Sequence, residues 1–203
     1  MKKAAIFLLV VIVMIVGYLF YSAKPGIRNA HLEGENIICF GDSLTYGTGA
    51  SDGMDYPSQL AGLTGHAVIN AGIPGDTTAD ALARLDKDVL SQYPRIVLIT
   101  LGGNDLKNRV PADTAFGNLK VIIEEIQERG ALVVIGGIDI PLFGRGFGKG
   151  YEQVCAQTGA LLIPNIYEDI FGRQGLMTDP IHPNDRGYQI MAERFYETIR
   201  PYL

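Results

Sequence analysis

Three side chains that could carry out nucleophilic hydrolysis stand near the two ends of the sequence. Ser43 lies in Gly-Asp-Ser-Leu (41–44), directly after an apolar run, where a buried strand would turn sharply into the next element. Asp179 and His182 stand three residues apart in Asp-Pro-Ile-His-Pro (179–183). A serine hydroxyl becomes an effective nucleophile when a histidine takes its proton and a carboxylate holds that histidine. These residues predict a Ser-His-Asp hydrolase, provided that folding brings them into contact.

Two loops could supply hydrogen-bond donors for the oxyanion that this reaction develops. Gly75 lies in a loop with two glycines (70–78), and glycine lets the backbone approach a ligand closely. Asn104 follows a predicted strand in Leu-Gly-Gly-Asn-Asp (101–105), where its side-chain amide could donate. The backbone N–H of Ser43 is the third candidate donor. Ordinary turns for the glycines and an Asx turn for Asn104 are the alternatives.

Apolar runs that alternate with amphipathic stretches predict an α/β fold. The predicted strands are residues 36–40, 67–70, 95–101, 131–135 and 160–163. The predicted helices are residues 56–64, 77–92 with the capping-box pattern Thr77-x-x-Asp80, 116–126 closed by Gly130, and 150–157. A final helix is expected to start near Pro183, a good first-turn residue, and to run towards Arg200.

This order of elements should gather the candidate residues. Strands that alternate with helices form a parallel sheet covered on both faces, and ligands bind beyond the carboxyl ends of its strands. Ser43, Gly75, Asn104 and the segment 179–182 each follow a different strand. Taken singly, the serine could cap a turn, the histidine could begin a helix and the aspartate could be a loop acid. Their shared edge of the sheet favours catalysis.

The four short motifs together resemble the GDSL, or SGNH, hydrolase family. The matching strings occur in the family's order and span residues 36–200: Gly41-Asp42-Ser43-Leu44, Gly75-Asp76-Thr77, Gly102-Gly103-Asn104-Asp105 and Asp179-x-x-His182-Pro183. The branch that they resemble most contains bacterial arylesterases and multifunctional thioesterase/lysophospholipase enzymes.

The resemblance implies a flavodoxin-like three-layer α/β/α sandwich with a five-stranded parallel sheet. It also implies that Ser43 is the nucleophile, His182 the base and Asp179 the partner of that base. Ser43, Gly75 and Asn104 would form the oxyanion hole. No metal or organic cofactor is implied.

The first residues predict a hydrophobic helix ahead of the catalytic domain. Residues 4–21 carry no charge and follow a pair of lysines, which is typical of a membrane span or a signal sequence. Tyr21 makes cleavage after Ala23 unfavourable, so an uncleaved anchor (1–23) is favoured over a signal peptide. The lysines predict an inside N-terminus. We expect a cell-envelope enzyme anchored to the cytoplasmic membrane with its catalytic domain outside, or otherwise a secreted or periplasmic protein.

Length and composition predict one hydrolase domain. Residues 24–35 are interpreted as a linker, and residues 36–203 suffice for a single sizeable core. A formal net charge of −5 and the lack of a long basic cluster beyond the N-terminus argue against nucleic-acid binding. Cys39 and Cys155 are expected to be small core residues. The three histidines lack metal-ligand spacing.

Sequence features leave several substrates open. A serine esterase of carboxylic esters or thioesters is the leading interpretation, and a membrane anchor would make lysophospholipids plausible substrates. A deacetylase of cell-wall carbohydrate and a non-catalytic binding module are the alternatives. Four apolar residues after the fourth strand are expected to form a substrate wall, unless they belong to the core: Ile138, Ile140, Leu142 and Phe143.

Overall fold

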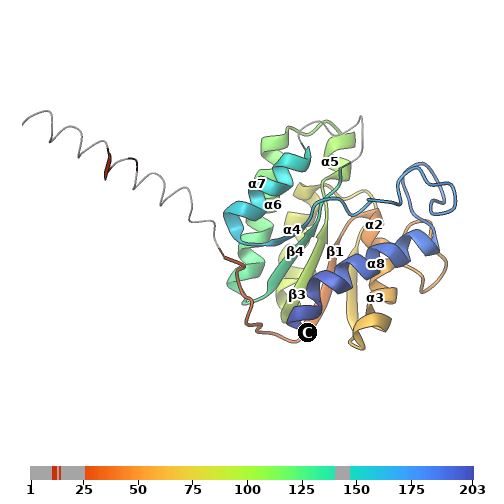
Figure 1. Cartoon of the computed structure of the whole chain (residues 1–203), viewed down its shortest axis with the longest axis horizontal. Coiled ribbons are helices and arrows are strands. Elements are labelled where there is room, and N and C mark those ends of the chain that lie inside the picture. Colours follow the sequence, from red (N-terminus) through yellow and green to blue (C-terminus); the bar gives the residue numbers. More distant parts are fainter. Residues whose placement is uncertain (1–10, 13, 15–25, 140–146) are drawn as a thin grey trace, which may run out of the picture.

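A five-stranded parallel sheet forms the centre of the computed structural model, which describes residues 11, 12, 14, 26–139 and 147–203 (Figure 1). The strands lie in the order β2-β1-β3-β4-β5. Their bounds are β1 Asn36–Gly41, β2 Val68–Gly72, β3 Pro94–Thr100, β4 Leu132–Gly136 and β5 Leu161–Ile163. This is the predicted α/β sandwich, and each predicted strand is present within two residues of its expected ends.

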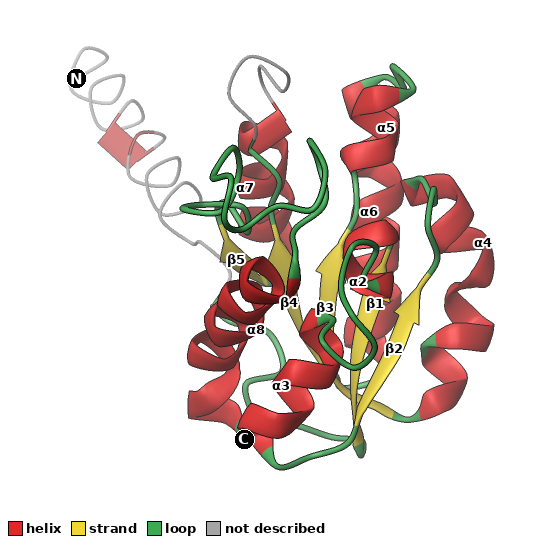
Figure 2. Ribbon diagram, turned by 90° about the vertical axis from the view of Figure 1, so that its right-hand side faces the viewer, coloured by secondary structure: helices red, strands yellow, loops and turns green. Residues whose placement is uncertain are grey.

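Helices cover both faces of the sheet (Figure 2). On one face α3 (Tyr56–Thr64) packs against α8 (Asp185–Ile199). On the other face α6 (Ala112–Glu128) lies between α4 (Thr78–Asp88) and α7 (Phe147–Thr158). Right-handed crossovers between parallel strands require this division of the helices. The chain moves towards one edge of the sheet from β1 to β2 and towards the opposite edge from β2 to β5. Short helical turns complete the described fold: α2 Ser43–Tyr46, α5 Gly103–Lys107, η1 Leu90–Gln92 and η2 Arg200–Tyr202.

The central strands are apolar on both faces because both faces are covered. Every residue of β4 is buried, and so are all but one of β3. Full burial of one such aliphatic side chain contributes about 1.5–3 kcal/mol, so these strands hold the two helical layers together. Cys39 in β1 and Cys155 in α7 are both buried and unpaired, as the sequence predicted.

The start of α4 was predicted correctly, whereas the role of Pro183 at the start of α8 was not. The predicted capping box is present at α4, where Thr77 accepts a bond from the Asp80 N–H and the Asp80 carboxylate accepts from the Thr77 N–H. The prediction that Pro183 is a first-turn residue of the last helix is wrong. Asn184 is the N-cap and α8 begins at Asp185, while Pro183 forms an isolated antiparallel bridge with Met177. Pro183 therefore belongs to the loop that precedes the helix.

The residues expected to form a linker contact the domain from Arg28 onwards. The Arg28 N–H donates to the Gly159 carbonyl, and the Asn29 side chain donates to the carbonyls of Gln127 and Ala131. The predicted N-terminal hydrophobic helix lies almost wholly outside the described residues. Among the residues that the structure describes, no helix combines the length and apolar composition that crossing a membrane requires.

Candidate active site

The nucleophile candidate stands at the first residue of a short helix directly after β1. Asp42 caps that helix by accepting the Leu44 N–H at 3.0 Å, so Ser43 is held at the start of α2. The turn is tight because Gly41 has no side chain. A Cβ there would lie 2.3 Å from Thr45 Oγ1 and 2.5 Å from the Thr100 carbonyl oxygen. Any larger residue at position 41 would therefore displace the turn that carries Ser43.

Folding brings Ser43, His182 and Asp179 into one chain of hydrogen bonds. His182 Nε2 lies 3.0 Å from Ser43 Oγ, and His182 Nδ1 lies 2.7 Å from Asp179 Oδ2. The serine and the histidine are separated by 139 residues in the sequence. The contact on which the sequence interpretation depended is therefore present.

The surroundings of Asp179 determine how the imidazole is protonated. Asp179 Oδ1 accepts the backbone N–H groups of Ile181 and His182. The His182 hydrogen bond is the main reason that the pKa of Asp179 is lowered to about 2. An ionised carboxylate can only accept, so Nδ1 of His182 carries a proton. In the neutral imidazole the Nε2 lone pair then faces the Ser43 hydroxyl, as a general base requires.

Hydrogen bonds between distant segments fix the distance from serine to histidine. The Thr178 hydroxyl donates to the Gly49 carbonyl at 2.8 Å, and the Tyr188 hydroxyl donates to the Thr48 carbonyl at 2.8 Å. These bonds tie the loop after α2 to both sides of the histidine loop. A backbone bond from the Thr178 N–H to the His182 carbonyl closes that loop into a turn. The catalytic geometry is thus braced by groups outside the four motifs.

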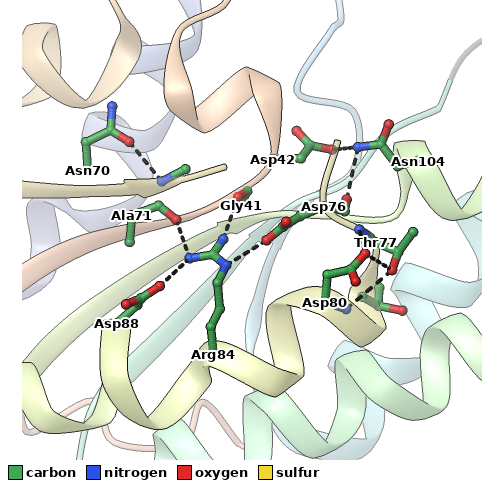
Figure 3. A network of polar contacts seen from close by, with 12 residues as sticks. Gly41, Asp42, Asn70, Ala71, Asp76, Thr77, Asp80, Arg84, Asp88 and Asn104 are labelled. Carbon is green, nitrogen blue, oxygen red and sulfur yellow. Dashed lines mark hydrogen bonds and ion pairs between the residues drawn. The ribbon is translucent and has the colours of Figure 1, made fainter. Parts of the chain in front are cut away.

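Asn104 lines the same cavity as Ser43 and bonds Asp42 and Asp76, which adjoin Ser43 and Gly75 in the sequence (Figure 3). Gly75 has φ +93°, a left-handed conformation that glycine adopts without strain. Asn104 Nδ2 donates to the Asp76 carbonyl oxygen at 2.9 Å and to Asp42 Oδ2 at 3.2 Å. Both hydrogens of the amide therefore have partners. Sequence reasoning placed Asn104 at the site but did not predict these partners.

Asp105 anchors the loop of Gly75 through Thr78. Asp105 is buried and accepts both the backbone N–H and the hydroxyl of Thr78, at 2.9 and 2.7 Å. Thr78 is the first residue of α4. The adjacent residues Asn104 and Asp105 thus hold the Gly75 loop at two points, Asp76 and Thr78. Within the described ranges, no group of three or more His, Cys, Asp or Glu side chains is placed to hold a metal ion.

A cavity of about 470 Å³ opens beside Ser43 and His182. Of the expected substrate wall, Ile138 lines this cavity, whereas Ile140, Leu142 and Phe143 lie outside the described residues. The sequence interpretation missed most of the apolar lining, which comes from α5, the loop after β5 and the neighbours of His182: Leu106, Tyr167, Phe171, Pro180 and Ile181. Two signals were available, since aromatic residues follow the fifth strand and two apolar residues precede the histidine.

Burial changes the acidity of the Asp42 carboxyl group. The residue is 3% exposed, and burial raises its pKa from 3.8 to about 7, with smaller contributions from the nearby charges of Asp76 and Asp105. The hydrogen bond from the Leu44 N–H opposes the rise. Asp42 is therefore an acid that titrates close to neutral pH beside Ser43.

This raised pKa predicts a specific dependence of stability on pH. Between about pH 4 and pH 7 the folded state keeps a proton on Asp42 that the unfolded state releases, so the contribution of Asp42 to stability falls as pH rises through this range. At about 1.4 kcal/mol per pKa unit, the loss is roughly 4 kcal/mol. Asp42→Asn removes it. The free energy of unfolding of the variant, relative to the unmodified enzyme, should rise by up to that amount from pH 4 to pH 8 in urea titrations.

Asp113→Asn is the matched control, because Asp113 is an exposed acid in the first turn of α6. Its pH profile should follow that of the unmodified enzyme. Parallel profiles for Asp42→Asn and the unmodified enzyme would show that Asp42 titrates normally.

Comparison with known proteins agrees with this geometry. The sequence profile of the GDSL-like lipase/acylhydrolase family matches residues 39–190. Esterase TesA of Pseudomonas aeruginosa is 31% identical over 181 residues, which cover 83% of this chain and 90% of that protein. Thioesterase 1/protease 1/lysophospholipase L1 of Escherichia coli is 28% identical, with 82% and 84% covered.

Solved structures give the same result. The crystal structure of TesA superposes with a TM-score of 0.78 at 30% identity and covers 83% of this chain and all of that chain (100%). The family profile spans β1 to α8 and includes the whole hydrogen-bonded chain from Ser43 to Asp179. The protein described here therefore belongs to the GDSL-like lipase/acylhydrolase family and is a serine hydrolase that acts on ester bonds.

Proposed function

We propose that Ser43 attacks the ester carbonyl, with His182 as general base and Asp179 as the residue that orients the imidazole. The observation that carries this proposal is the continuous chain Ser43 Oγ–His182 Nε2–His182 Nδ1–Asp179 Oδ2, with distances of 3.0 and 2.7 Å. His182 takes the hydroxyl proton as the carbon–oxygen bond forms, and returns it to the leaving alcohol or thiol. Water, activated by the same imidazole, then releases the acid from the acyl-enzyme.

The proposed oxyanion hole consists of the backbone N–H groups of Ser43 and Gly75 and the Asn104 amide. Neither backbone N–H has a hydrogen-bond acceptor within the described part of the chain, so both are free for a ligand. The Asn104 amide must exchange one of its present bonds for the oxyanion. The bond to Asp42 Oδ2 is the longer of the two, at 3.2 Å, and is the one that we expect to yield.

A fluorophosphonate probe and a series of p-nitrophenyl acyl esters test this function. We expect labelling and hydrolysis by the full-length enzyme, and loss of both in Ser43→Ala. The acyl series from acetyl to dodecanoyl measures how much of the apolar cavity a chain can use. Hydrolysis of acetylated glycans with no activity on this series would instead support the carbohydrate deacetylase. Equal labelling of the enzyme and Ser43→Ala would contradict Ser43 as nucleophile.

The lining of the cavity favours one class of natural ester. Besides its apolar residues, the cavity is lined by Lys107 and Arg109, which are exposed. An ester with an apolar acyl chain and a phosphate on its alcohol would contact both kinds of lining. We therefore propose lysophospholipids as substrates, with thioesters of similar acyl chains as a second class. The name of the Escherichia coli relative supports both.

Removing the positive charges of Lys107 and Arg109 should abolish the preference of the enzyme for a phosphorylated ester. We expect the enzyme to hydrolyse 1-acylglycerol 3-phosphate with a kcat/KM roughly 3- to 10-fold above that for the uncharged 1-acylglycerol, because exposed charge pairs contribute at most about 1 kcal/mol each. In Lys107→Gln/Arg109→Gln the two values should become equal. Lys87→Gln on α4 is the control and should keep the ratio. A ratio unchanged in the double variant would exclude these cations from recognition.

We further propose that the enzyme acts in the cell envelope, held by the apolar run at residues 4–21. The support is the sequence itself, with a pair of lysines before the run. Fractionation of cells that express the full chain tests this. Recovery in the membrane fraction, and accessibility of the catalytic domain to protease added outside the cytoplasmic membrane, are the expected results. A soluble cytoplasmic protein would contradict the proposal.

A further inference from the structure

One guanidinium group connects the end of β1, the end of β2 and the loop of Gly75. Arg84 lies on α4, and its side chain is only 13% exposed. Its Nε donates to Asp76 Oδ2 at 2.6 Å, one terminal nitrogen donates to the Ala71 carbonyl at 2.9 Å, and the other donates to the Gly41 carbonyl at 2.9 Å. Figure 3 shows these bonds converging on the one side chain.

Each acceptor belongs to a segment that leads into the proposed oxyanion hole. Gly41 precedes the turn that carries Ser43, and Ala71 lies at the end of β2, where the Gly75 loop begins. Asp76 directly follows Gly75, and its carbonyl oxygen accepts the Asn104 amide. Arg84 therefore contacts the supports of all three proposed donors, although it touches none of the donor groups itself.

We propose that Arg84 is a positioning residue that sets the relative placement of the Ser43, Gly75 and Asn104 donors. This inference rests on the proposed oxyanion role of those three residues. Through Asp76 the guanidinium fixes both the loop of Gly75 and the acceptor that holds the Asn104 amide. Through the Gly41 carbonyl it ties the same loop to the nucleophile turn.

Only an arginine can make this set of contacts. Its planar fork carries donors in several fixed directions, whereas a lysine has a single nitrogen. The guanidinium carbon also lies 4.5 Å from the centroid of the Phe40 ring, so the plane is supported by a buried side chain of β1. A lysine at position 84 would keep the positive charge for Asp76 but lose the simultaneous bonds to the two strand ends.

The test compares Arg84→Lys with Asp76→Ala and a matched control on the same guanidinium. Asp88→Asn is the control, because Asp88 also bonds Arg84, at 3.0 Å, but lies at the far end of α4. Asp76→Ala keeps the backbone carbonyl that accepts Asn104 and removes the ion pair to Arg84. For each variant we measure kcat and KM on a p-nitrophenyl ester, affinity for a boronic-acid analogue of the tetrahedral intermediate, and the melting temperature.

We expect kcat to fall by up to about 10²-fold in Arg84→Lys and Asp76→Ala, because small misplacements of catalytic groups have effects of this size. Affinity for the boronic acid should fall in parallel while KM changes by less than about 3-fold, which a merely structural role would not produce. Asp88→Asn should retain kcat.

Three results would each have a different meaning. Unchanged kcat and analogue affinity in folded Asp76→Ala and Arg84→Lys would overturn the positioning role and leave the proposed function intact. Hydrolysis by the unmodified enzyme that does not depend on Ser43 would overturn the proposed function itself. A fall in kcat with both KM and the affinity for the boronic acid unchanged would also contradict positioning, since it would indicate that less of the enzyme is folded.

Discussion

Substituting His182 with alanine is expected to lower kcat for a p-nitrophenyl ester by about 10⁴-fold or more. The reason is geometric, since His182 Nε2 is the group within 3.0 Å of Ser43 Oγ that can take its proton. KM should change little, because the cavity proposed to bind the acyl chain is lined mainly by other side chains. Stopped assays with active-site titration measure both constants. Retention of more than about 1% of kcat would contradict His182 as the base.

A second variant separates the base from its orienting partner. Asp179→Asn keeps the size of the side chain but offers an amide to the ring, so the imidazole is no longer held in the tautomer that faces Ser43. We expect a fall of roughly 10³- to 10⁴-fold. The carboxyl has a pKa of about 2 in the folded enzyme, so it stays ionised through the assay range. Loss of turnover on acidification from neutral pH would therefore not arise from protonation of Asp179.

Substituting Asn104 with alanine is expected to lower kcat by about 10²- to 10³-fold, which is the usual effect of losing one oxyanion donor. The amide is placed for this role by its bonds to the Asp76 carbonyl and Asp42 Oδ2. Because the oxyanion exists only after attack, KM should be nearly unchanged. Steady-state constants and affinity for a tetrahedral boronic acid are the measurements.

Asn118→Ala is the matched control for Asn104. Asn118 lies on α6 and donates to the Thr78 hydroxyl at 3.2 Å, so it supports the same part of the chain without facing the site. We expect its kcat to stay within about 3-fold of the unmodified enzyme. Equal losses in both variants would mean that the asparagines act through the stability of the loop, and would contradict an oxyanion role for Asn104.

Much of the fold was predictable because its signals are local. The fully apolar stretch of β4 and the capping box at Thr77 and Asp80 each follow from residues within one element. The gathering of Ser43, Asn104 and His182 at one edge was predictable for a different reason. In a parallel sheet every strand ends at the same edge, so chain order alone places the loops together.

Contacts that depend on exact distances between elements were not predictable. Arg84 has the appearance of an ordinary polar residue on an amphipathic helix, and its role depends on how close α4 passes to the ends of β1 and β2. The pairing of Asn104 with Asp42 likewise joins residues 62 positions apart. Pro183 was misplaced because first-turn proline is only a tendency, and here the N-cap Asn184 determines where the helix begins.

The separation of 139 positions between Ser43 and His182 also has a consequence for folding. The bonds that brace the two halves, from Thr178 to Gly49 and from Tyr188 to Thr48, join equally remote parts of the polypeptide. Topologies of such high contact order pay a large loop-closure entropy before these contacts form. A nascent chain that has emerged only as far as β5 contains Ser43 but does not yet contain His182. Esterase activity is therefore a late event in folding, and its appearance during refolding reports that the last helix has docked.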